Sequence, residues 1–149
     1  DYYLDEGERY MAYRAAYVAY IENILTMAGV DNAAARAADV MAMETALAGV
    51  HWTAEQSRET VANYHPMSRA ELDSYAPGFP WQTFFDALEI GDISEVIVNT
   101  DTVVQGTAQL FAETPVDVLA SYLAFHFRSA AGPFRRSQLR LLFAHTARR

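Results

Sequence analysis

The stretch YMAYRAAYVAYIENILTMA, residues 10–28, decides the fold class of this chain. Large apolar and aromatic residues recur in it at intervals of three and four, which is the spacing of one face of an α-helix. Gly29 follows and is typical of a left-handed helix end, while Asp31 is placed to cap the next helix. The predicted inward face consists of Tyr10, Tyr13, Tyr17, Tyr20, Ile24 and Ala28.

Further helices are predicted over most of the chain, because the same spacing continues and several segments begin with a residue that can cap a helix. Val96, Ile97 and Val98 are β-branched and favour a strand. We therefore predict a mainly α protein, a multi-helix lobe with at most one short strand near Val96–Val98. The expected helix starts are Asn32, Thr53, Ser68, Pro80, Thr100 or Asp101, and Thr114.

Glu44 is the most informative single residue of the predicted helices. It shares a helical face with Ala37 and Met41, so its carboxylate is expected to be at least partly buried. A buried carboxylate is costly unless cations or amide donors surround it. Arg58, in the following segment, is the predicted ion-pair partner of Glu44. A site acid is the functional alternative for this carboxylate.

Other large side chains are predicted to form the core. Trp52 and Trp81 are interpreted first as anchors between helices and second as aromatics that face a ligand. The tyrosines of the first helix have the hydroxyls to line a wet cavity, but helical packing accounts for them without one. The last predicted helix is expected to bury Val116, Leu119, Leu123 and Phe127.

Composition restricts the classes of function. A chain of 149 residues fits one domain, and 52% hydrophobic content is enough for a core. It has no cysteine, which excludes disulfides and thiolate metal sites. Residues 1–127 combine five arginines with all 19 acidic residues, a net charge of −14, which argues against nucleic acid as a partner. The apolar stretches are too short for a membrane span.

Catalytic motifs are absent from the sequence. A zinc peptidase places two histidines one helical turn apart with a glutamate as general base, but no H-E-x-x-H occurs here. There is also no nucleophile elbow, P-loop or dinucleotide fingerprint. We predict no catalytic, cofactor-binding or metal-binding residue in this chain. The four histidines are His51, His65, His126 and His145, of which the closest two are 14 positions apart.

Five blocks of sequence nevertheless resemble a known family. They include DYY at residues 1–3, ETALA at residues 44–48 and YHPM at residues 64–67, where the family usually has Asn in the second place. FPW at residues 79–81 and the Val-Ile-Val run before a helix follow in order. Together they resemble the N-terminal region of the neprilysin-like zinc metallopeptidases, which include the endothelin-converting enzymes.

The resemblance covers about residues 1–127 and implies a partial helical lobe. In this family the lobe closes over a catalytic lobe and encloses a cavity that admits peptides but not folded proteins. The zinc ligands and general base are expected downstream, so zinc belongs to the full-length family. The implied partners are peptide substrates and the missing catalytic lobe, and the implied location is extracytoplasmic. Such a chain shapes the substrate cavity and is inactive alone. A free-standing α-helical protein-binding module is the alternative.

Residues 128–149 have a different character. They contain six arginines and no acidic residue. We interpret them as a divergent basic tail, and our hypothesis is that a frameshifted or truncated reading frame produced it. A genuine basic helix is the alternative, because Leu139, Leu142 and Phe143 can share one face. Translation of the source DNA in the other two frames distinguishes the two interpretations.

Overall fold

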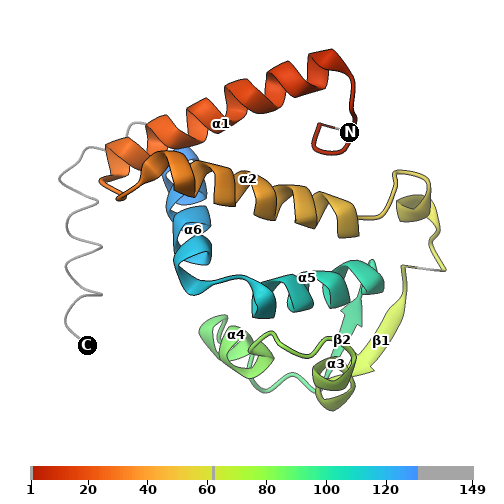
Figure 1. The fold of residues 1–149 in the computed structure, drawn as a ribbon. Coiled ribbons are helices and arrows are strands. Elements are labelled where there is room, and N and C mark those ends of the chain that lie inside the picture. The colour runs from red at the N-terminus through yellow and green to blue at the C-terminus, as the bar shows by residue number, and fades with distance from the viewer. Residues whose placement is uncertain (1, 62, 131–149) are drawn as a thin grey trace, which may run out of the picture.

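The computed structural model describes residues 2–61 and 63–130, so most of the predicted basic tail lies outside the described residues. Within these ranges the fold is mainly α, as predicted, with one two-stranded sheet (Figure 1). None of the helices in this part of the chain is long and apolar enough to cross a membrane. The elements are α1 Glu8–Ala28, α2 Ala33–Val50, a 3₁₀ turn at Gln56–Arg58, β1 His65–Ser68, α3 Arg69–Tyr75, α4 Trp81–Ala87, β2 Glu95–Val98, α5 Asp101–Glu113 and α6 Val116–Ala130.

Three helices form the first half of the core. Helix α1 packs along α2, and α6 crosses both of them near the α1–α2 turn (Figure 1). Phe125 of α6 is 2% exposed and lies against the rings of Tyr17 and Tyr20. Its insertion between α1 and α2 fixes the position of α6. The fully buried members of this cluster are Ile21, Leu25, Ala37, Val40 and Phe125.

A second cluster lies on the other side of α5, where α3, α4 and the sheet gather (Figure 1). Helix α5 also packs against α2, so it joins the two halves of the fold. Arg69 strengthens this second half: its guanidinium lies over the Phe85 ring and donates to the carbonyl oxygen of Gly91 at 3.0 Å. The buried residues are Leu72, Ala76, Phe85, Val98 and Ala108.

The predicted strand is present, and its partner is a strand that the sequence did not indicate. Strand β2 pairs antiparallel with β1, with Pro66 opposite Ile97. Proline lacks an amide hydrogen and therefore argues against a strand, so the sequence pattern does not predict β1. Ser68 ends β1 and begins α3 with a complete capping box, in which it exchanges hydrogen bonds with Glu71 as predicted.

The cap predictions at the α1–α2 turn are half right. Gly29 ends α1 in the left-handed region, at φ 77°, which a residue without a Cβ adopts without strain. Asp31 does not cap α2, because Asn32 occupies the cap position in a left-handed conformation without a side-chain hydrogen bond.

The helix predicted to begin at Thr53 is reduced to a single turn. Thr53 and Gln56 exchange the hydrogen bonds of a capping box, but only a short 3₁₀ turn follows.

The predicted inward faces of α1 and α6 are shifted around the helix axis. In α1 the fully buried residues are Ile21 and Leu25, whereas Tyr13 and Tyr20 are exposed. In α6 the predicted stripe is wrong at Val116, Leu123 and Phe127, which are 81%, 65% and 48% exposed. Both helices carry apolar residues on more than one face, so the spacing alone does not select the side that meets a neighbour. In α6 that side carries Ser121 and Phe125.

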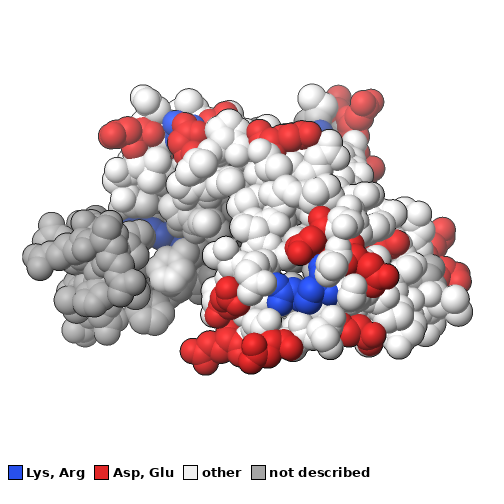
Figure 2. All heavy atoms as spheres, turned by 90° about the horizontal axis from the view of Figure 1, so that it is seen from below, with Lys and Arg blue, Asp and Glu red and all other residues white. Residues whose placement is uncertain are grey.

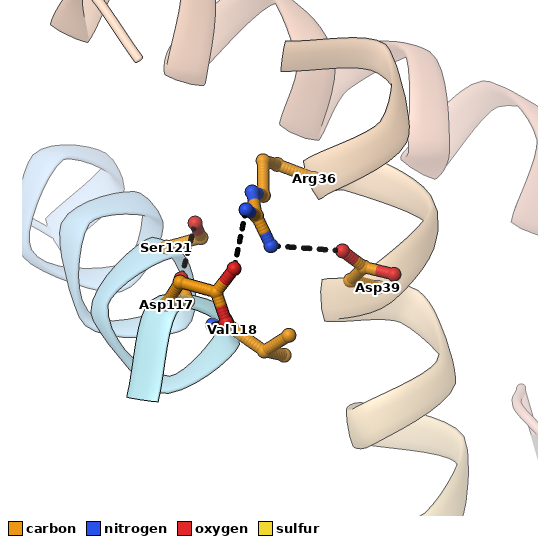
Figure 3. Close-up of polar contacts among 5 residues, drawn as sticks. All are labelled: Arg36, Asp39, Asp117, Val118 and Ser121. Atoms are coloured by element: carbon orange, nitrogen blue, oxygen red, sulfur yellow. Dashed lines mark hydrogen bonds and ion pairs between the residues drawn. The ribbon is translucent and has the colours of Figure 1, made fainter. Parts of the chain in front are cut away.

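An ion pair sets the beginning of α6 against α2 (Figure 3). Arg36 of α2 contacts a carboxylate oxygen of Asp117 at 2.5 Å and one of Asp39 at 3.3 Å. The hydrogen bond from Arg36 lowers the pKa of the Asp117 carboxyl. Asp117 also accepts the amide hydrogen of Val118 at 3.0 Å. A negative charge in the first turn of a helix is favourable, so this contact orients α6 and stabilises its start.

The shifted face of α6 predicts a contrast between two substitutions in the same helix. Phe125→Ala should lower the free energy of unfolding by about 3–5 kcal/mol, because it leaves a cavity between α1 and α2. Leu123→Ala, two residues away, should change it by less than about 0.5 kcal/mol. Urea denaturation of both variants measures the difference. A larger loss for Leu123→Ala than for Phe125→Ala contradicts the placement of α6.

Candidate functional site

The most distinctive site is built around the Glu44 carboxylate, which is 6% exposed. One of its oxygens, Oε2, accepts a hydrogen bond from the Tyr3 hydroxyl at 3.2 Å. The other, Oε1, accepts one from the Tyr17 hydroxyl at 3.2 Å and lies 2.8 Å from Nε2 of His126. These donors come from the N-terminal segment, α1 and α6, while Glu44 belongs to α2. One carboxylate therefore joins four parts of the chain.

Two cavities flank this carboxylate, and Tyr3 lies in the wall of both. The first has a volume of about 390 Å³ and lies between the N-terminal segment, α1 and α2. The second has a volume of about 320 Å³ and contains Glu44 itself. The second cavity is lined by Tyr3, Glu44, Leu47, Ala48, His51, Tyr122 and His126.

Arg14 holds the N-terminal segment in this position. Its Nη1 donates to the carbonyl oxygens of Tyr2 at 2.9 Å and Asp5 at 2.8 Å. The ring of Tyr2 also lies edge-on to the ring of Tyr10, with centroids 5.9 Å apart. Because Tyr3 lies between the two anchored carbonyls, its hydroxyl is held where it reaches Glu44.

Burial and the carboxylate together keep the surrounding phenols protonated. Burial raises the pKa of the Tyr17 hydroxyl well above its usual value, and the nearby charge of Glu44 raises it further. The same two causes, in the same order, raise the pKa values of Tyr3 and Tyr122. At neutral pH the two phenols that contact Glu44 are therefore hydrogen-bond donors. These two phenols therefore bond the buried carboxylate without carrying a charge themselves.

The predicted burial of Glu44 is confirmed, but its predicted partner is wrong. Arg58 lies exposed in the 3₁₀ turn after α2, and the carboxylate is instead satisfied by Tyr3, Tyr17 and His126. Tyr17 was predicted to lie on an inward face, which was the one available signal. Tyr3 and His126 are 41 and 82 positions from Glu44, and no local pattern connects residues at such separations.

Among the described residues, His51 shares the second cavity with His126, whereas His65 lies on β1. His65 lies 3.7 Å from a carboxylate oxygen of Asp101, which also accepts a hydrogen bond from the Tyr75 hydroxyl at 3.1 Å. His51 lines the second cavity, and His145 lies outside the described residues. Within residues 2–61 and 63–130, no group of three or more histidine, aspartate and glutamate side chains is arranged to hold a metal ion.

The two tryptophans connect elements of the fold. Trp81 packs in the second core cluster, and its indole nitrogen donates to the carbonyl oxygen of Ala76 at 2.8 Å. Trp52 is half-buried after the end of α2 and donates to the hydroxyl of Thr102 at 2.6 Å. That bond attaches the end of α2 to the start of α5. Both indole side chains thus connect elements of the fold, as the first interpretation predicts.

Sequence comparison places the chain in a family. The N-terminal model of peptidase family M13 matches residues 1–146. The chain belongs to peptidase family M13. Human endothelin-converting enzyme-like 1 is 27% identical over 129 residues, which cover 83% of this chain and 16% of the relative. Rat endothelin-converting enzyme 1 is 25% identical over 132 residues, 85% of this chain and 17% of the relative. The chain thus spans about a sixth of these M13 relatives.

Solved structures give the same result for the fold of this M13 chain. The crystal structure of Mycobacterium tuberculosis zinc metalloprotease Zmp1 in complex with inhibitor superposes with a TM-score of 0.74 and 26% identity, over 83% of this chain and 19% of Zmp1. The open state of Zmp1 gives a TM-score of 0.69 at 23% identity, over 90% of this chain and 24% of Zmp1. The predicted resemblance to the N-terminal region of this zinc metallopeptidase family is confirmed.

The family match also bears on the organisation of the chain. It continues to residue 146, past the predicted boundary after residue 127. The boundary and the frameshift interpretation stay predictions, because residues 131–149 lie outside the described ranges. Translation of the source DNA in the other two frames is their test.

The raised pKa values of Tyr3 and Tyr17 predict a loss of stability at alkaline pH. Both phenols hold their protons more tightly when folded than a free phenol, whose pKa is about 10. Their contribution is therefore complete below about pH 10 and is lost as the pH rises above that value toward the pKa of the folded state. Urea denaturation between about pH 8 and pH 11 should show this decline.

Two phenylalanine variants test the assignment of that decline. Tyr17→Phe should flatten it, because the variant has lost a group that titrates beside Glu44. Tyr20→Phe, which removes a phenol that does not bond Glu44, should leave the decline as steep as in the parent chain. Equal slopes for all three proteins contradict the role of Tyr17.

Proposed function

We propose that this chain forms part of the N-terminal helical lobe of a zinc metalloendopeptidase, where it shapes the wall of the peptide cavity and does not catalyse by itself. The single observation that supports this most is the match of residues 1–146 to the N-terminal model of peptidase family M13. The superposition on Zmp1, a zinc metalloprotease, supports the same assignment. Peptide substrates and zinc are then properties of the assembled enzyme.

The architecture suits the role of a cavity wall. A wall that excludes folded proteins must keep its shape, and α1, α2 and α6 are held by a shared apolar core and by the Glu44 contacts. Closing lobes also exclude water from the reaction, which requires a rigid surface on each side. The bonds to Glu44 supply this rigidity in the part of the chain described by the structure.

The exposed apolar face of α6 also supports a role as part of a larger assembly. Val116, Leu123 and Phe127 are large, apolar and 48–81% exposed, and they recur along one helix. Exposed apolar side chains at helical spacing are typical of a surface that packs against another element. A lobe of a larger peptidase provides such an element. This observation favours the lobe over a free-standing binding module.

A replacement experiment tests the proposal directly. The segment of Zmp1 that aligns with this chain should be exchanged for residues 2–130, and the chimera assayed with a quenched fluorescent peptide and with a folded protein. We expect zinc-dependent cleavage of the peptide and no cleavage of the folded protein. A chimera with Phe125→Ala, whose helical wall is weakened, should lose activity, whereas one with Glu22→Gln, at an exposed carboxylate of α1, keeps both the core and the apolar face of α6 and serves as the control.

The isolated chain provides the complementary measurement. It should show no peptidase activity with added zinc, and it should associate at micromolar concentration through its exposed apolar face. Chelator-sensitive cleavage by the isolated chain contradicts the proposed division of roles. A monodisperse monomer that unfolds cooperatively, together with a chimera that is inactive although folded, supports the binding module instead.

A further inference from the structure

Glu44 is unusual in having no permanent cation beside it. The chain has no lysine, and no arginine side chain contacts this carboxylate within residues 2–61 and 63–130. A buried carboxylate normally pairs with a cation, because transfer of its charge from water is costly. Here two phenols and one imidazole replace the cation. The two phenols solvate the negative charge with hydrogen bonds but carry no charge that would neutralise it.

The carboxylate also retains capacity to accept another hydrogen bond. A carboxylate offers about four acceptor positions on its two oxygens. Among the described residues, Oε1 accepts from Tyr17 and contacts His126, whereas Oε2 has one donor, the Tyr3 hydroxyl. The less occupied oxygen is thus the one bonded to the N-terminal segment. An additional donor is best accommodated at Oε2.

The second cavity provides the space for such a donor. It has a volume of about 320 Å³ and is lined by Glu44 together with the aromatic side chains of Tyr3 and Tyr122. The Tyr122 ring is fixed against the His126 ring, with centroids 4.3 Å apart. Aromatic faces attract cations. The first cavity is less suitable, because the guanidinium of Arg14 lies in its wall.

Long-range electrostatics favour the same kind of ligand. Residues 1–127 carry a net charge of −14, from five arginines and 19 acidic residues. On the face shown in Figure 2, acidic side chains lie at many places and basic side chains are few. A negative field of this kind raises the local concentration of cations and repels anions.

We propose that the second cavity is a binding site for an organic cation, a guanidinium or a primary ammonium group, which bonds Oε2 of Glu44 and lies between the rings of Tyr3 and Tyr122. A cationic group donates the hydrogen bond that Oε2 lacks and neutralises the buried charge. The proposal rests on the surroundings of Glu44 and on the negative charge of the chain. It does not depend on the proposed role as a peptidase lobe, so either proposal can fail without the other.

Isothermal titration calorimetry of the full chain with small probes tests this site. The cationic probes are Nα-acetyl-arginine amide and Nα-acetyl-lysine amide, and the neutral probe is Nα-acetyl-citrulline amide, which has nearly the shape of the arginine probe. The measurement is made near pH 8, where free imidazole is neutral.

We expect millimolar binding of one or both cations, weakened by salt, and at least about tenfold weaker binding of the citrulline probe. Preference for arginine or lysine identifies the guanidinium or the ammonium as the ligand. Equal binding of all three probes, or binding of none, overturns the proposal.

Substitutions separate a binding role from a structural one. Tyr3→Phe removes the hydroxyl that donates to Oε2 and keeps the ring, so it should tighten binding of the cation by about threefold or more. Glu44→Gln should abolish binding, while Glu22→Gln, at an exposed carboxylate of α1, should leave it unchanged. If Glu44→Gln does not fold, cation binding by Tyr3→Phe distinguishes a binding role from a structural one. Unchanged or weaker binding in Tyr3→Phe means that the phenol serves only the fold and contradicts the site.

Discussion

The burial of one carboxylate is the constraint on which the helical half of this protein depends. Glu44 is 6% exposed, and a charge in that position is tolerated only when donors surround it. The donors are supplied by the N-terminal segment, α1 and α6. All three elements must reach the carboxylate at the same time, so the hydrogen bonds that Glu44 needs restrict their relative positions. Loss of the charge would remove the reason for their convergence.

Further contacts locate α6 at its two ends. Arg36 pairs with Asp117 where α6 begins, and Arg128 donates to the carbonyl oxygen of Met27 at 3.1 Å where α6 ends. Phe125 fills the space between these points. Apolar packing supplies most of the stability of such a unit, whereas polar contacts select one arrangement among several of similar packing. Helix α6 is thus held near both ends and at Phe125 against two other helices, which is the rigidity that the proposed cavity wall requires.

The sequence predicted those features that depend on neighbouring residues. The mainly α class, the left-handed end at Gly29 and the capping box at Ser68 are set within one or two helical turns. The strand partner of Val96–Val98, the inward face of α6 and the partners of Glu44 were missed, because segments far apart in the chain determine them. Arg58 is near Glu44 in the sequence and carries the opposite charge, but the fold brings phenols from α1 and the N-terminal segment to the carboxylate. The family resemblance was confirmed because it depends on several sequence blocks in a fixed order and not on any single side-chain contact.

A double-mutant cycle between α2 and α6 tests the central role of the carboxylate most directly. The free energies of unfolding of the parent chain, Glu44→Gln, His126→Phe and the double variant are measured by urea denaturation. Every one of these proteins keeps an aromatic ring at position 126, beside Tyr122. The account predicts a coupling energy of about 1 kcal/mol or more between the two positions. Additive losses, with a coupling within about 0.3 kcal/mol of zero, would show that α6 is held by apolar packing without Glu44.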